Sequence, residues 1–234
     1  MELMEDQLVV AAPPGKIESS GSRQEHSNWK IIVVGDMNSG KTSIIERYCD
    51  GHFMEYYKST TGIDLKKKII NYENKPIFLN ICNMFLFIYI IRDTAGTEKY
   101  QSLIQLYYRG AIGLFIVYDI TNLNSLHNLE FWMKNIDDFA PSNVVRILIG
   151  NKCDLESNRK VSTEEGQLVA QHFGIPFFEV SSKNNLNVDD SFMKMVSMIN
   201  EMESENAIKK DFEVLDDKVI LGEIDSKTSS KCKC

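Results

Sequence analysis

Hydrophobic positions between residues 28 and 202 follow two different patterns along this 234-residue chain. Short apolar runs bounded by polar residues predict strands, several of them buried on both faces. Between these runs, apolar residues recur at helical spacing. The expected strands cover residues 30–35, 64–71, 76–91, 111–118, 144–149 and 176–180, and the expected helices cover residues 42–49, 125–139, 162–173 and 187–202. Strands that alternate with helices predict an α/β fold with a mostly parallel, six-stranded sheet and helices on both faces.

Two polar segments without periodicity flank this region. Residues 1–27 predict a disordered extension, and residues 203–234 predict a flexible tail that ends Lys-Cys-Lys-Cys. The intervening residues 28–202 suit one domain of ordinary size. The N-terminus is acidic where a secretory signal needs positive charge, and position 2 is not the glycine that myristoylation requires. We therefore expect neither a secretory signal nor N-myristoylation.

Composition and charge narrow the class of protein. Hydrophobic residues make up 43% of the chain, enough for a sizeable core, and the net charge is −7. An acidic surface does not attract a nucleic-acid backbone, so we expect no nucleic-acid partner. The five cysteines show neither zinc-ligand spacing nor a disulfide framework, which favours a reducing, cytosolic compartment.

The strongest chemical signal is at residues 35–42, which read Gly-Asp-Met-Asn-Ser-Gly-Lys-Thr. This pattern follows a predicted strand and opens a predicted helix, as a phosphate-binding loop does. Glycines let backbone N–H groups approach a phosphate chain, Lys41 meets the β- and γ-phosphates, and the Thr42 hydroxyl ligates magnesium. The predicted phosphate-binding residues are Gly35, Asn38, Ser39, Gly40, Lys41, Thr42 and Ser43.

Residues 151–154 read Asn-Lys-Cys-Asp directly after a buried strand. Guanine presents its ring N1–H and exocyclic N2–H donors side by side, and one carboxylate accepts both. Asp154 is placed to do this, and adenine would leave that carboxylate unpaired. We therefore expect Asn151, Lys152 and Asp154 to select guanine.

A third motif, Asp-Thr-Ala-Gly at residues 93–96, follows the apolar run of residues 76–91. An acidic residue at this point can hold magnesium through water. The Gly96 N–H can reach the γ-phosphate of a bound triphosphate. The motif therefore completes a predicted site for GTP or GDP with Mg²⁺.

Together these motifs resemble those of the Ras-superfamily small GTPases, and within them the Rab branch. Rab-like sequences also stand at residues 59–64 (Ser-Thr-Thr-Gly-Ile-Asp), 107–111 (Tyr-Tyr-Arg-Gly-Ala) and 117–121 (Val-Tyr-Asp-Ile-Thr). The resemblance covers residues 28–202 and implies the P-loop NTPase, or small G-protein, fold.

The resemblance also implies roles for the remaining site residues. Thr60, nineteen residues after Lys41, would close over magnesium and the γ-phosphate in the GTP state. Residues 181–183, Ser-Ser-Lys, stand where the family has its last guanine-binding loop. The implied catalytic residues are Lys41, Thr60, Gly96 and Thr97, the implied magnesium ligands are Thr42, Thr60 and Asp93, and the last guanine-loop residues are Ser181, Ser182 and Lys183.

The implied function is a switch that hydrolyses GTP slowly and acts in vesicle and membrane trafficking. Its expected partners are an exchange factor, a GTPase activator, a prenylation escort or dissociation inhibitor, and effectors, and we expect a monomer. Cys232 and Cys234 resemble the Cys-X-Cys ending that Rab proteins have geranylgeranylated on both thiols. Two lipid chains would anchor the protein to the cytoplasmic face of an endomembrane, cycling with the cytosol.

Two departures from the family pattern bear on hydrolysis and open an alternative function. Thr97 replaces the glutamine that orients the attacking water, and Met37 puts a bulky side chain near the γ-phosphate. Both favour slow intrinsic hydrolysis, and a GTP-locked or pseudo-GTPase binding module is the alternative. A P-loop kinase that uses ATP is disfavoured by residues 151–154 and by the lack of a lid region.

Two further departures concern the region between the first and third motifs. The positions of the aromatic triad that Rab effectors meet read Leu65, Arg92 and Tyr107, so only one aromatic remains. The step from Thr60 to Asp93 is longer than in the family, and removal of residues 82–91 restores the spacing.

The apolar insertion at residues 82–91 leaves three alternatives open. Residues 77–81 could stay in the sheet while the insertion bulges outward and exposes an apolar patch. Residues 85–91 could instead form the strand behind a lengthened hairpin, which we prefer because it keeps Asp93 at a strand end. The segment could also be a translated short intron.

Overall fold

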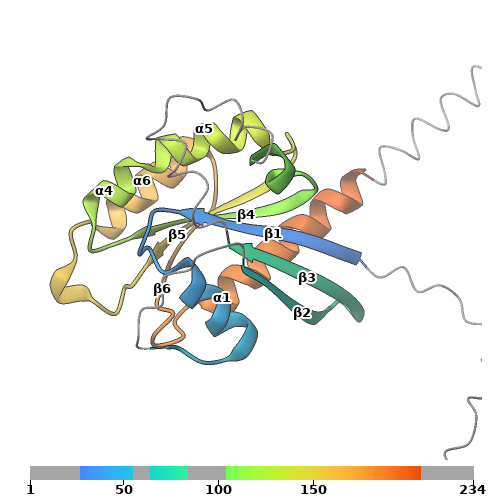
Figure 1. The fold of residues 1–234 in the computed structure, drawn as a ribbon, viewed down its shortest axis with the longest axis horizontal. Helices are drawn as coiled ribbons and strands as arrows, with labels where there is room; N and C mark the ends of the chain where they lie inside the picture. Colours follow the sequence, from blue (N-terminus) through green and yellow to red (C-terminus); the bar gives the residue numbers. More distant parts are fainter. Residues whose placement is uncertain (1–26, 55–63, 84–103, 207–234) are drawn as a thin grey trace, which may run out of the picture.

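The computed structural model describes residues 27–54, 64–83 and 104–206, and at its centre lies a six-stranded sheet (Figure 1). Its strands lie in the order β2-β3-β1-β4-β5-β6. β2 runs antiparallel to β3, and the other neighbouring strands are parallel. The bounds are β1 Ser27–Gly35, β2 Asp64–Tyr72, β3 Lys75–Asn83, β4 Ala111–Asp119, β5 Val145–Asn151 and β6 Phe177–Val180. The predicted mostly parallel sheet is therefore confirmed.

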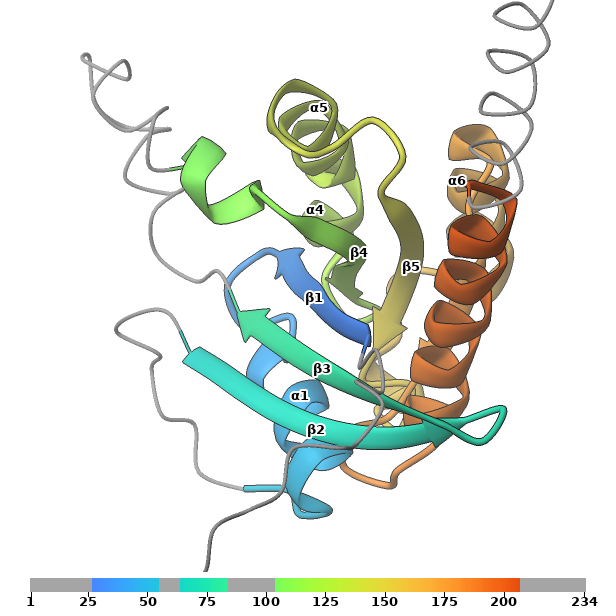
Figure 2. The ribbon, with the colours of Figure 1, turned by 90° about the vertical axis from the view of Figure 1, so that its right-hand side faces the viewer.

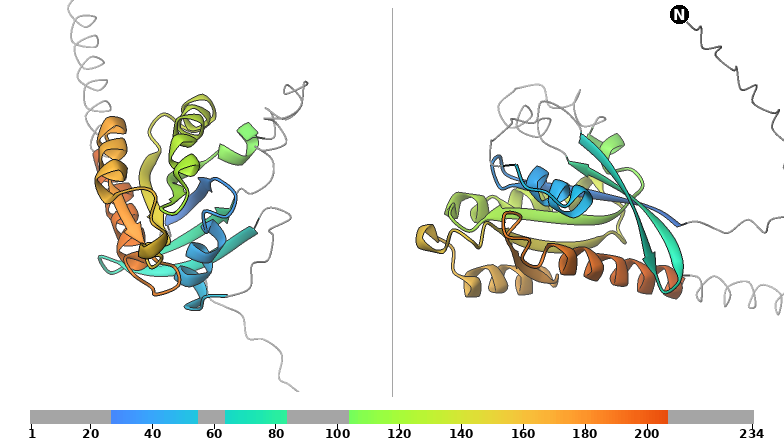
Figure 3. Two further views of the ribbon diagram at one scale, coloured as in Figure 1. Left: turned by 90° about the vertical axis from the view of Figure 1, so that its left-hand side faces the viewer. Right: turned by 90° about the horizontal axis from the view of Figure 1, so that it is seen from below.

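Helices cover both faces of this sheet (Figures 2 and 3). α1 (Lys41–Asp50) and the helix of residues 188–206 pack on one face, where Ile44, Tyr48 and Phe192 join one buried cluster. On the other face lie residues 104–108 and the helices α4 (Leu123–His127), α5 (Leu129–Phe139) and α6 (Thr163–Phe173). Within the described residues, no helix combines the length and hydropathy needed to cross a bilayer.

The central strand β1 shows why its sequence is apolar without alternation. Ile31 and Val33 belong to the buried cluster on the α1 face. Ile32 and Val34 belong to the cluster on the α5 face, and all four side chains are fully buried. A strand covered by helices on both faces has no polar side, so its side chains read as a continuous hydrophobic run.

The predicted helices are found, with two adjustments. α6 begins with a capping box, in which Ser162 and Glu165 each accept a hydrogen bond from the other's backbone N–H. The segment of residues 125–139 is divided into α4 and α5 at Asn128. The last helix continues past the predicted end at 202, and Glu203 accepts a hydrogen bond of 3.1 Å from the Trp29 indole.

The β2–β3 hairpin tests the preferred structural alternative for residues 82–91. Its turn consists of Glu73 and Asn74, both with positive φ, between the paired Tyr72 and Lys75. This tight turn starts β3 at Lys75 and places residues 77–81 beside β1. The preferred alternative, a strand over residues 85–91 behind a lengthened hairpin, is therefore wrong. Residues 84–103 lie outside the described part of the chain.

Candidate nucleotide-binding site

The turn between β1 and α1 has a backbone that only small or turn-forming residues adopt easily. Gly40 has a φ of 88°, and a Cβ there would lie 2.1 Å from Nδ2 of Asn151. Gly35 has a φ of 141°, and a Cβ there would lie 2.0 Å from the carbonyl oxygen of Val117. Asn38 takes a φ of 63°, which asparagine tolerates better than most residues. α1 begins at Lys41, directly after this turn, so a helix N-terminus faces the space that the turn encloses.

Lys41 lies at the base of the turn with only 3% of its surface exposed. Its ammonium group donates hydrogen bonds to the carbonyl oxygens of Gly35 (2.9 Å) and Asp36 (2.7 Å). Burial lowers the pKa of Lys41 to about 8, although the nearby Asp36 carboxylate opposes the shift. A buried cation at a helix N-terminus is suited to a polyanion, which replaces the water that the ammonium lost on burial.

Asp36, inside the same turn, is held by two side chains that lie 92 and 96 positions later in the sequence. One carboxylate oxygen accepts a hydrogen bond of 2.9 Å from the Trp132 indole, and the other accepts one of 2.6 Å from the Asn128 amide. Asp36 is only 6% exposed, and Trp132 is 2% exposed. Sequence reasoning missed this interaction, because no local pattern links the first turn of the domain to α5.

The loop after β5 lies against the phosphate loop. Asn151, fully buried, donates a hydrogen bond of 2.8 Å to the carbonyl oxygen of Ser39. Lys152 has a positive φ of 68°, and its ammonium forms an ion pair of 2.6 Å with Asp119 at the end of β4. Two of the three predicted guanine-selecting residues of this loop therefore hold it in place beside the phosphate loop and β4.

The loop after β6 meets the same region. The Ser181 hydroxyl donates a hydrogen bond of 2.6 Å to the Asp154 carboxylate. Arg47 of α1 donates to the carbonyl oxygens of Ser182 (2.8 Å) and Lys183 (3.0 Å). The structure thus joins the predicted guanine residues of two separate loops, and it fastens the second loop to the helix that carries Lys41.

Thr42, the predicted magnesium ligand of α1, has an unexpected neighbour. The side-chain amide of Asn83 donates a hydrogen bond of 2.7 Å to the Thr42 hydroxyl oxygen. Asn83 is the last residue of β3 and is fully buried. No motif in the sequence singled it out. The long step from Thr60 to Asp93 was the one sequence signal that pointed to this region of the chain.

Three buried polar atoms around the phosphate loop lack a hydrogen-bond partner within the described residues. They are Ser39 Oγ, Asn83 Oδ1 and Asn151 Oδ1. Buried polar atoms seldom lack a partner, so several of them around one turn indicate that a bound group belongs there. A guanine nucleotide with Mg²⁺ fits this donor set. The phosphates match the loop amides and Lys41, magnesium matches the Thr42 oxygen, and the base matches Asp154.

Six predicted site residues lie outside the described part of the chain. Thr60 falls in the gap of residues 55–63, and Asp93, Gly96 and Thr97 fall in the gap of residues 84–103. The lipidation residues Cys232 and Cys234 follow the last described residue, 206. Ser43 is half-buried in the first turn of α1, next to Thr42.

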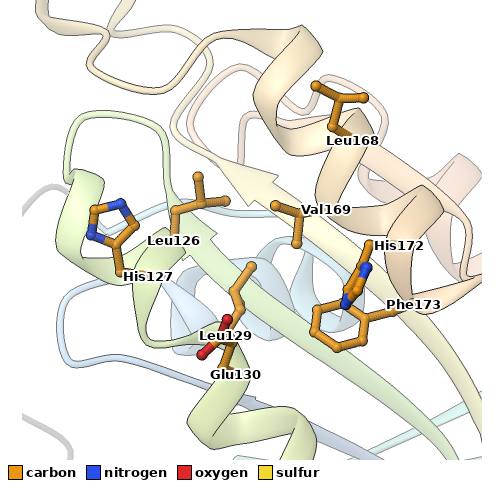
Figure 4. A pocket seen from close by; sticks show the side chains of 8 residues that line it. All are labelled: Leu126, His127, Leu129, Glu130, Leu168, Val169, His172 and Phe173. Atoms are coloured by element: carbon orange, nitrogen blue, oxygen red, sulfur yellow. The ribbon is translucent and has the colours of Figure 1, made fainter.

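A separate pocket of about 280 Å³ lies between α4, α5 and α6. Figure 4 shows apolar side chains along it, among them Leu126, Leu129 and Phe173, with His127, Glu130 and His172 also lining it. None of its lining residues belongs to the loops that carry Lys41, Thr42 or Asp154. The pocket is therefore distinct from the candidate nucleotide site.

Comparisons with known proteins agree with this geometry. A sequence model described as the Ras family matches residues 30–201. The human Ras-related protein Rab-3A is 40% identical over 192 residues, which are 82% of this chain and 82% of that protein. Rab-10 of Caenorhabditis elegans is 42% identical over 171 residues, covering 73% and 80% of the two chains. RABD2c of Arabidopsis thaliana is 39% identical over 171 residues, with the same coverage.

Proposed function

The chain belongs to the Ras family and is a Rab-like small GTPase, and from this premise we propose which residues carry its activity. The protein binds GTP and GDP with Mg²⁺, hydrolyses GTP and acts as a switch in membrane trafficking. Like Rab proteins in general, it works with regulators and effectors. The residue roles, the rate of hydrolysis and the membrane anchor are proposals.

The observation that supports the proposed site best is the pair of hydrogen bonds that joins its loops. Asn151 donates to the Ser39 carbonyl, and Ser181 donates to the Asp154 carboxylate. In our proposal, residues 35–43 hold the phosphates and Asp154 accepts both donors of the guanine edge. Asn151 and Ser181 are positioning residues, because they orient the loops without touching the reacting atoms.

Lys41 and the loop amides would stabilise negative charge on the transferring phosphoryl group. The loop is held rigidly by Asp36, so these donors need no reorganisation when charge develops. When bound, Mg²⁺ neutralises charge on the phosphates. Thr42 would hold it from α1, and Thr60, Gly96 and Thr97 would complete the catalytic set in the GTP state.

Nucleotide selectivity tests the proposed site. Purified chain should retain GDP, and fluorescent mant-GDP should bind at least about 100-fold more tightly than mant-ADP, because adenine leaves the Asp154 carboxylate unpaired. Equal affinity for the two nucleotides, or no retained guanine nucleotide, would contradict the assignment of Asp154 and of the phosphate loop.

A GTP-locked binding module, whose turnover is too slow to end the GTP state, is the second candidate, and Thr97 is the residue that favours it. Threonine is too short to orient the attacking water as glutamine does. Single-turnover hydrolysis of bound GTP separates the two candidates. A measurable rate supports the slow enzyme, and a bound GTP that outlasts the assay supports the locked module.

The membrane anchor is proposed from the last residues of the chain. We infer geranylgeranyl groups on Cys232 and Cys234, which would place the protein on the cytoplasmic face of an endomembrane. Mass spectrometry of protein from its native cells would detect both modifications. A variant with both cysteines replaced by serine should leave the membrane fraction, and one that remains there would contradict the anchor.

A further inference from the structure

We propose that Asn83, and not Asp93, faces the magnesium ion in this protein, which puts a neutral amide beside the ion where the family pattern has a carboxylate. The inference rests on the proposed function. It concerns one edge of the site, where β3 ends beside the first turn of α1. The observations that carry it are a strand register, a hydrogen bond and an unpartnered oxygen.

The register places Asn83 at the carboxyl end of β3, paired with Val33 of β1. Two residues later, β1 reaches Gly35 and the phosphate loop begins. Ligands of parallel α/β sheets bind outside the carboxyl ends of the strands. Asn83 is therefore the β3 residue that lies at the carboxyl edge of the sheet, beside the phosphate loop.

The sequence spacing agrees with this register. If residues 82–91 are removed, Arg92 follows Ile81 directly, and Asp93 then occupies the position of Asn83. In the full chain, β3 pairs with β1 up to Asn83, and the strand contains no residue of the third motif. The strand-end position that Asp93 takes when residues 82–91 are removed is therefore occupied by Asn83 in the full chain.

The contacts of Asn83 suit a residue of a metal shell. Its amide nitrogen donates to the hydroxyl oxygen of Thr42, the predicted magnesium ligand, at 2.7 Å. Its carbonyl oxygen Oδ1 is buried and lacks a partner within the described residues. An amide oxygen is a hard, neutral ligand that accepts hydrogen bonds from magnesium-bound water. Binding of the hydrated ion would satisfy the oxygen that the protein leaves unpaired.

The consequence is a weak dependence of nucleotide release on magnesium. A carboxylate beside the ion adds negative charge to the shell, and an amide does not. Because outer-shell residues typically change metal affinity about 10-fold to 100-fold, the change of charge is large enough to measure.

The test is the rate at which full-length protein releases mant-GDP, titrated with free Mg²⁺. The readout is the Mg²⁺ concentration that slows release by half, and it needs no hydrolysis. Asn83→Asp should lower that concentration about tenfold. Asp93→Asn is the matched control and should leave it unchanged. Deletion of residues 82–91 restores Asp93 to the strand end and should act like Asn83→Asp.

Three results would overturn the proposal, each read as the midpoint, which is the Mg²⁺ concentration that slows mant-GDP release by half. Asp93→Asn could raise the midpoint tenfold. Asn83→Asp, or the deletion of residues 82–91, could leave the midpoint unchanged. If Asn83→Asp does not fold, Asn83→Ala decides: a raised midpoint supports the proposal and an unchanged one contradicts it. Wild-type protein that retains no mant-GDP would instead contradict the proposed function, and the inference with it.

Discussion

The indole N–H of Trp132 donates a hydrogen bond of 2.9 Å to the carboxylate of Asp36, across 96 positions of sequence. The Asn128 amide donates to the other carboxylate oxygen at 2.6 Å. Trp132 belongs to the buried cluster between the sheet and α5, so the phosphate loop is connected directly to the core. The conformation of the phosphate loop is therefore tied to a residue of the hydrophobic core.

Trp132→Phe should separate this hydrogen bond from the packing of the ring. The substitution keeps an aromatic side chain but removes one of the two donors to a buried carboxylate. We expect a loss of about 2 kcal/mol in the free energy of unfolding and a mant-GDP affinity several-fold weaker. Urea denaturation and equilibrium binding measure the two effects.

The other tryptophan provides a matched control. Trp29 is equally buried, and its indole N–H donates to Glu203 on the last helix, away from the phosphate loop. Trp29→Phe should lower stability by less and leave the affinity for mant-GDP unchanged. An affinity loss shared by both variants would show that the Asp36 contact has no particular role in the loop.

Local sequence patterns predicted most of the helices and strands, because burial and helix capping leave their pattern in short stretches of sequence. The apolar runs of β1, β4 and β5 reflect burial on both faces, and the capping box of α6 needs only Ser162 and Glu165, three positions apart. The motifs at residues 35–42 and 151–154 lie at the strand ends where the pattern put them. Their mutual contact follows from the parallel order of the sheet.

The register of β3 could not be predicted in the same way. Residues 77–81 and 85–91 are both apolar and both suit a central strand. The decisive feature is the turn at Glu73 and Asn74, whose positive φ values allow a hairpin with no extra residues. The contacts of Asp36 and Asn83 depend on side chains brought together by the fold, which no spacing along the chain reveals.

Ser181→Ala should weaken guanine selection without direct loss of a nucleotide contact. The Ser181 hydroxyl fixes one oxygen of Asp154 at 2.6 Å, so its removal lets the carboxylate rotate away from the base edge. We expect mant-GDP affinity to fall about tenfold, and mant-ADP affinity to change little.

Ser191→Ala is the control for this prediction. Ser191 is also buried, but its hydroxyl donates to the Val188 carbonyl within the last helix. This variant should bind mant-GDP as the wild type does. A Ser181→Ala protein with unaltered guanine affinity would mean that Asp154 is oriented by other groups.

Nucleotide affinity should fall as the pH rises through about 8. Burial lowers the pKa of Lys41 to about 8 in the free protein, and bound phosphates would raise that pKa by stabilising the ammonium. Binding above this pH therefore requires uptake of a proton. The affinity for mant-GDP at pH 8.5 should be about fourfold weaker than at pH 7, a window in which guanine keeps its N1 proton.

Lys41→Arg tests whether this pH dependence belongs to Lys41. Arginine stays protonated throughout the window, so its variant should bind more weakly but with an affinity that does not change between pH 7 and 8.5. A wild-type affinity that is flat over this range would show that Lys41 stays charged in the free protein. A slope that persists in Lys41→Arg would assign the proton to another group.

Thr97→Gln should convert a slow GTPase into a faster one. Glutamine reaches and orients the attacking water, whereas threonine is too short, so we expect the single-turnover rate to rise about tenfold or more. Affinity for mant-GDP should not change, because the residue acts on the water and not on the ground-state nucleotide. Thr97→Ala is the matched control and should remain slow. Human Rab-3A, assayed in parallel, supplies the reference rate. A wild-type rate equal to that of Rab-3A, or a Thr97→Gln rate equal to that of Thr97→Ala, would show that residue 97 does not limit hydrolysis here.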